Sequence, residues 1–115
     1  MSTRSLIARK TAGGFEAVYC HSDGYTEHVL PVLTKHYATD AAVDELIGLG
    51  DMSSLGKPYE DDQHRAPPSP SELFATEEAL IARAAKCWAE YIYVFIDGRW
   101  FYRKTSEGEW RVKSL

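Results

Sequence analysis

The hydrophobic and polar positions predict β-strands at both ends of the chain, where short runs rich in apolar, β-branched and aromatic residues are bounded by turns that contain glycine. Residues 4–10 and 15–21 flank a turn that contains two glycines, so we expect them to pair as a hairpin. Neither face of the second strand is purely polar. One face carries Phe15, Ala17, Tyr19 and His21, and the other carries Glu16, Val18 and Cys20.

An Asp-Gly step at residues 23–24 interrupts the second strand, and there the glycine can take a positive φ at little cost. Apolar residues then recur with the spacing of a helix, which we expect to begin near Glu27 or His28. Pro31 is tolerated in this helix only if it lies within the first turn.

Two further helices are expected. The first spans about residues 39–50, with Thr39 or Asp40 as its N-cap and a glycine at its end. The other covers residues 76–90, with Thr76 as its N-cap. Its inward face is expected to hold Leu80, Ala84 and either Cys87 or Trp88.

Strands return in residues 91–96, 99–104 and 110–115, and Asp97-Gly98 between the first two is a strong signal for a tight hairpin turn. Residues 51–72 hold four of the five prolines and show no periodicity, which predicts a long, proline-rich, acidic loop at residues 57–71.

These elements predict a single α+β domain over residues 1–115. The expected order is β-β-α-α-loop-α-β-β-β, with an antiparallel sheet of about five strands and about three helices on one face of it.

Composition indicates the cellular location of the protein and the redox state of its cysteines. The longest apolar run, residues 91–96, is too short to span a membrane, and the first residues lack the apolar stretch of a secretion signal. We therefore expect the protein in the cytoplasm. Its two cysteines, Cys20 and Cys87, are expected to be reduced thiols.

Charge is distributed unevenly along the chain. The net charge is −4, but residues 40–82 hold ten acidic and two basic side chains, whereas residues 83–115 hold seven basic and four acidic ones. A partner would therefore meet a polarised surface.

The sequence gives little support for a catalytic site or a metal site. Cys20 and His21 are neighbours in a strand and point to opposite faces, so they cannot form an activated nucleophile. His21, Asp23, His28 and His36 lack the spacings of known metal sites, so we favour surface or capping roles for them. Residues 48–57 match neither phosphate-binding loop pattern. We therefore predict no catalytic residue, no metal site, no cofactor and no enzymatic activity.

Two binding surfaces remain. The C-terminal strands interleave aromatic residues with cations, which could bind single-stranded nucleic acid, although such a sheet more often buries its aromatics in the core. The acidic middle of the chain could instead present carboxylates to a basic groove that normally holds nucleic acid. The residues predicted for this contact are Asp44, Glu45, Asp51, Glu60, Asp61 and Asp62.

Several segments resemble a family of small proteins carried by phages and other mobile elements. They are "VYCHSDGY", "LTKHY", "VDELIGLGDMSSLG" and "EYIYVFIDGRWFYR", and the likeness covers about residues 4–56 and 90–102. The positions that match its pattern are Tyr19, Cys20, His21, Asp23, Gly24, Tyr25, Gly50, Asp51, Ser53 and Ser54. The resemblance implies a protein similar in kind to anti-CRISPR inhibitors, which act by binding rather than by catalysis.

Our leading hypothesis is therefore an anti-CRISPR-like inhibitor that binds a bacterial CRISPR effector complex stoichiometrically and blocks its nucleic-acid surface with acidic residues. This mechanism involves no membrane and no direct contact with nucleic acid. The alternative is a nucleic-acid-binding accessory protein that uses the basic, aromatic C-terminal strands. The sequence leaves the target and the oligomeric state open.

Overall fold

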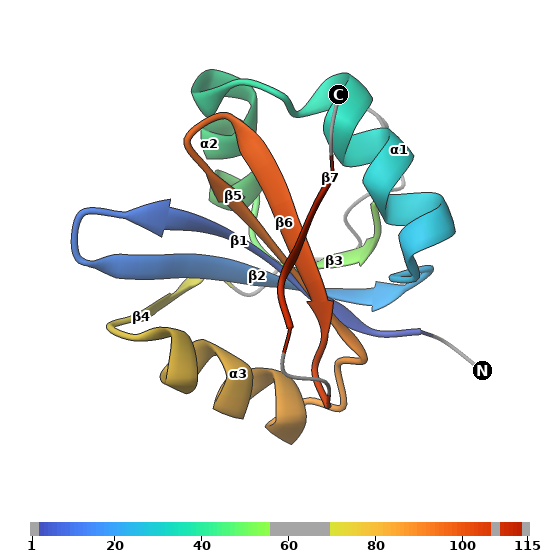
Figure 1. Ribbon diagram of the computed structural model, residues 1–115, viewed down its shortest axis with the longest axis vertical. Helices are drawn as coiled ribbons and strands as arrows, with labels where there is room; N and C mark the ends of the chain where they lie inside the picture. Colours follow the sequence, from blue (N-terminus) through green and yellow to red (C-terminus); the bar gives the residue numbers. More distant parts are fainter. Residues whose placement is uncertain (1–2, 56–69, 107–108, 114–115) are drawn as a thin grey trace.

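The chain forms one twisted sheet with helices on both of its sides (Figure 1). This computed structural model describes residues 3–55, 70–106 and 109–113. Within them the sheet has seven strands, in the order β3-β2-β1-β5-β6-β7, and β4 pairs with the same edge of β2 as β3. The strands are β1 (Ser5–Thr11), β2 (Gly14–Ser22), β3 (Met52–Ser54), β4 (Glu72–Phe74), β5 (Tyr91–Ile96), β6 (Arg99–Lys104) and β7 (Arg111–Lys113).

The α+β class and the order of the main elements are as the sequence predicts. The sheet is mixed, however, because β1 runs parallel to β5 and β2 runs parallel to β3. The N-terminal hairpin thus docks on the C-terminal one through a parallel pair, which the sequence of neither hairpin specifies. The short strands β3 and β4 lie in a stretch that was expected to be irregular.

Three helices cover the sheet, α1 (Thr26–His36), α2 (Asp40–Gly48) and α3 (Glu77–Lys86). The expectation that they share one face is wrong. Helices α1 and α2 pack on one face, over a cluster that includes Ile7, Leu33 and Tyr93, and α3 packs on the other, over Ala8 and Val94 (Figure 1). Both faces are therefore apolar, which explains why β2 shows no purely polar side.

The C-terminal hairpin has the tight turn that the sequence predicts. Asp97 and Gly98 both take positive φ, at 49° and 81°, and join Ile96 to Arg99 in a two-residue turn. This is the conformation that a primed turn requires, and it matches the right-handed twist of the strands.

The helix starts agree with the sequence, with one adjustment. The Thr39 and Thr76 side chains accept hydrogen bonds from the backbone N–H groups of Ala42 and Ala79, at 3.2 and 3.1 Å, and so act as N-caps. Helix α1 begins at Thr26, slightly earlier than expected, so Pro31 lies beyond its first turn.

Most of the predicted loop at residues 57–71 lies outside the described residues. Among the described helices, none is long and apolar enough to cross a membrane.

Candidate binding groove

Three of the sequence motifs meet at one end of the sheet. The backbone N–H of Tyr19 donates a 2.8 Å hydrogen bond to the carboxylate of Asp51, which lies 32 residues away. The Tyr93 hydroxyl donates to the carbonyl of Gly24 at 2.6 Å, within the buried interior. Direct contacts thus join segments that lie far apart in the sequence.

The Asp23-Gly24 corner connects β2 to α1, as expected, but the residue with the positive φ is not the glycine. Asp23 is the residue with positive φ, at 58°, a conformation that aspartate tolerates better than most residues. Gly24 is needed for space, because a Cβ atom there would lie 2.7 Å from the Ser5 hydroxyl oxygen and 2.8 Å from the Thr3 carbonyl oxygen. The Gly24 N–H donates to that same Thr3 carbonyl at 2.8 Å.

Cys20 and His21 lie on opposite faces of β2, as strand geometry predicts. The Cys20 thiol is buried and donates to the Ser22 carbonyl at 3.3 Å, and burial raises its pKa to about 11. A thiol with so high a pKa is a poor nucleophile. His21 is exposed, and its Nδ1 hydrogen-bonds the Tyr19 hydroxyl at 2.9 Å.

The polar residues of this corner do not assemble a metal site. In the described part of the chain, no three His, Cys, Asp or Glu side chains come close enough to hold an ion. The Nε2–H of His28 instead donates to the Leu55 carbonyl at 2.9 Å and ties α1 to the segment after β3.

Three of the predicted acidic contact residues lie in the described part of the chain, in different surroundings. Asp44 is 67% exposed but pairs with Arg9 at 2.9 Å. Asp51 is half-buried, and burial raises the pKa of its carboxyl group although the Tyr19 hydrogen bond opposes this shift. Glu45 is exposed on α2. Glu60, Asp61 and Asp62 lie outside the described residues.

The aromatic face of the C-terminal strands is largely core. Tyr93, Phe95 and Trp100 are buried beneath α1 and α2, and the Trp100 indole N–H donates to the Tyr37 carbonyl at 2.8 Å. The open stacking platform considered from the sequence is therefore closed along most of its length. Tyr91 and Tyr102, nearer the end of the sheet, are only half-buried.

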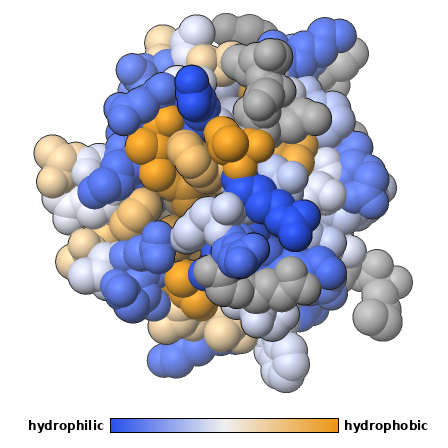
Figure 2. Space-filling view, viewed as in Figure 1, coloured by the Kyte–Doolittle hydropathy of each residue, from blue (hydrophilic) through white to orange (hydrophobic). Residues whose placement is uncertain are grey.

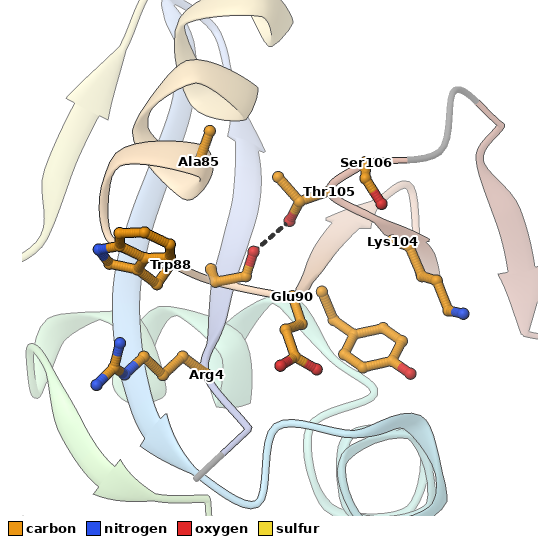
Figure 3. Close-up of a pocket in the computed structure, with 9 residues that line it drawn as sticks. Arg4, Ala85, Trp88, Glu90, Lys104, Thr105 and Ser106 are labelled. Atoms are coloured by element: carbon orange, nitrogen blue, oxygen red, sulfur yellow. Dashed lines mark hydrogen bonds between the residues drawn. The ribbon is translucent and has the colours of Figure 1, made fainter. Parts of the chain in front are cut away.

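A groove of about 730 Å³ opens at that end, between the C-terminus of α3 and the end of β6 (Figure 3). Figure 3 shows Trp88 and Arg4 on one side of it, Lys104 and Ser106 on the other, and Glu90 between them. Backbone hydrogen bonds hold its walls together. The Glu90 N–H donates to the Arg4 carbonyl at 2.7 Å, and the Thr105 N–H donates to the Glu90 carbonyl at 2.9 Å. The Thr105 hydroxyl adds a 2.7 Å bond to the Ala89 carbonyl.

Trp88 is the most unusual residue in this groove. Helix α3 ends at Lys86, and the Ala89 N–H reaches back to the Ala84 carbonyl at 2.9 Å. Trp88 lies inside this closing turn with φ at 64°, at the position that glycine usually takes. Its side chain is 76% exposed, so of the two residues expected at the inward face it is Cys87, half-buried against the core cluster under α3, that packs there.

The groove continues onto the α1 side of the sheet. A second hollow of about 380 Å³ shares Tyr91 and Lys104 with it, and adds Tyr102, Arg103 and Arg111. Arg103 is buried, with its guanidinium over the Trp110 ring and bonded to the Lys104 and Thr105 carbonyls, so it shapes this hollow from within.

A smaller apolar hollow lies over the opposite end of the β5–β6 hairpin. It has a volume of about 210 Å³, and Val94, Ile96 and Phe101 contribute to its walls. Figure 2 shows hydrophobic side chains gathered on this face over the β5–β6 hairpin. Helix α3 covers only part of this face.

Comparison with known proteins found no family model, curated protein or solved structure that matches the chain.

Proposed function

We propose that this protein is a binding protein without catalytic activity, which inhibits a bacterial defence system by occupying an effector complex. The groove beside Trp88 is its contact surface. The observation that carries this proposal is the conformation of Trp88, a large aromatic residue held in solvent at a backbone position where glycine would be favoured.

The fold alone does not account for this tryptophan. A left-handed conformation at a residue other than glycine costs about 1–3 kcal/mol. With 76% of its surface exposed, the Trp88 side chain recovers little of that by packing. A glycine would close α3 with the same hydrogen bonds and no strain. Tryptophan is also the residue type most enriched among the energetic centres of binding interfaces.

The groove also has the variety of groups that recognition needs. The cationic side chains of Arg4 and Lys104, the carboxylate of Glu90 and the hydroxyls of Thr105 and Ser106 all line it. The walls belong to the sheet and to the end of α3, so the contact groups are carried by well-bonded backbone. A rigid surface loses less entropy when it binds.

The resemblance to proteins of mobile elements supports a CRISPR effector complex as the partner class to test first. Purified effector complexes of different types would be titrated with the wild-type chain, Trp88→Ala and Leu73→Ala. Leu73 is a matched control, since it is also 76% exposed but lies on β4, outside the groove. Trp88→Ala should weaken binding by about thirtyfold, the effect of losing an interface centre worth about 2 kcal/mol, and Leu73→Ala should not. Equal affinities for the two variants would overturn the proposal.

A second candidate contact is the acidic outer surface of α2, which would imitate nucleic acid. It is favoured by the exposure of Asp40, Asp44 and Glu45 on that helix. Reversing Asp40 and Glu45 to lysine should then weaken binding and flatten its salt dependence, and reversing Glu60, Asp61 and Asp62 should add to the effect. Reversing Glu77 and Glu78 on α3 to lysine is the control, because it changes the net charge by the same amount on the other side of the sheet. Loss of binding only with the α2 variants would favour charge imitation over the groove.

A further inference from the structure

We propose that the groove takes a single strand of nucleic acid, with a base stacked on Trp88 and the backbone phosphates on the cations around it. This rests on the proposed function, in which the groove is the contact surface. CRISPR effector complexes contain such strands, both as guide RNA and as displaced DNA. The inference departs from the expectation that the protein avoids direct contact with nucleic acid.

The first argument is the alternation of rings and cations along one continuous path. From the end of α3 to β7 the path passes Trp88, then Tyr91, then Tyr102. Arg4, Lys104 and Arg111 lie along the same path. Single strands bind by this combination, since every base has a face that can stack and every linkage carries a phosphate.

The second argument is local charge. The chain as a whole carries −4, yet the two joined hollows have four basic side chains, Arg4, Arg103, Lys104 and Arg111, against the acidic Glu90 and Glu109. The path is thus positive on a negative molecule, so a phosphate backbone would be guided to it and away from the acidic α2.

Arg4 is available to a ligand in a way that Arg9 and Arg83 are not. The guanidinium of Arg9 is bonded to Glu16, and that of Arg83 to Glu72. No ion pair of Arg4 is found in the described part of the chain, and its Nε lacks a hydrogen-bond partner there. A reorientation onto a phosphate would therefore break no ion pair.

Glu90 indicates which bases the groove should prefer. A carboxylate in the groove repels phosphate but accepts hydrogen bonds from exocyclic amino groups. Cytosine, adenine and guanine have such groups and thymine has none. The base stacked on Trp88 should therefore be one that carries an amino group.

The test is a titration of labelled 12-nucleotide oligo(dC) and oligo(dT) with the protein, at about 50 mM salt, where phosphate contacts are strong. Wild-type protein should bind oligo(dC) more tightly than oligo(dT). Trp88→Ala should weaken binding by about tenfold, the effect of one stacked base, and Trp88→Phe should restore most of it. Arg4→Ala should lower the salt slope by about one. Leu73→Ala should bind like the wild type.

Cytidine monophosphate distinguishes the two sources of such a ligand. Binding of the oligomer at least tenfold tighter than of the monophosphate assigns a strand, and equal affinity assigns a free nucleotide to the same groove. Absence of binding to either at about 100 μM protein, the weak end of non-specific association, would overturn the inference. So would binding that Trp88→Ala leaves intact. If the effector complex still requires Trp88 while no oligonucleotide binds, the proposed function stands and the groove contacts protein instead.

Discussion

The carboxylate of Asp51 accepts a 2.8 Å hydrogen bond from the backbone N–H of Tyr19 and thereby ties the segment before β3 to the middle of β2. Replacing Asp51 with alanine leaves this half-buried N–H without its acceptor, which should destabilise the fold by about 1–2 kcal/mol. Asp51→Asn keeps an acceptor oxygen and should retain most of the stability. Urea unfolding of the three proteins measures the difference, and equal midpoints for Asp51→Ala and wild type would contradict it.

The same carboxyl group should make stability depend on pH. Burial raises its pKa above the usual aspartate value, so the folded state holds this proton more tightly than the unfolded state does. The contribution of the group is therefore largest at low pH and declines as pH rises from the unfolded pKa through the raised one. Unfolding free energies of the wild type, compared with Asp51→Asn, should fall over that interval, and a rise there would reverse the sign.

The buried contact from Tyr93 to Gly24 should contribute measurably to stability. Tyr93→Phe removes the hydroxyl that donates to the Gly24 carbonyl at 2.6 Å and leaves that carbonyl unpaired in the interior. A loss of about 1–2 kcal/mol is expected in chemical unfolding. Tyr102→Phe is the matched control, because no hydrogen bond is recorded for the half-buried Tyr102 hydroxyl within the described ranges. Equal losses in the two variants would contradict this role.

Gly24 should tolerate no side chain. In Gly24→Ala the new methyl group would press on the Thr3 carbonyl oxygen and the Ser5 side chain, both under 3 Å away, and the corner would have to shift. Strain of this kind costs about 1–3 kcal/mol. Gly48→Ala, where nothing lies within 4 Å of the new Cβ, should leave thermal stability close to that of the wild type. A Gly24→Ala protein as stable as Gly48→Ala would show that the corner adapts freely.

Local chemistry made much of the fold predictable. The Asp97-Gly98 turn and the caps at Thr39 and Thr76 depend on residues close in sequence, and the structure has each of them. The parallel pairing of β1 with β5 depends on how two apolar faces dock, and no short segment encodes that.

The groove was missed because its formation depends on where one helix ends. Successive helical residues differ by about 100° in direction, so ending α3 at Lys86 instead of continuing it through Trp88 turns Trp88 from the core to solvent. The signal that could have indicated it is the aromatic residue at the end of an amphipathic helix with no glycine to close it. The contact of Tyr19 with Asp51 spans 32 residues and has no local signal.

The central claim is that Trp88 is held in its strained, exposed position for binding. Trp88→Gly tests it most directly, because glycine relieves the positive φ while it removes the ring. Urea unfolding and titration with the effector complex would be measured together on the wild type, Trp88→Ala and Trp88→Gly. We predict that Trp88→Gly is more stable than Trp88→Ala by about 1 kcal/mol, at least as stable as the wild type, and as deficient in binding as Trp88→Ala. A glycine variant that binds like the wild type, or one that is less stable than Trp88→Ala, would contradict this account.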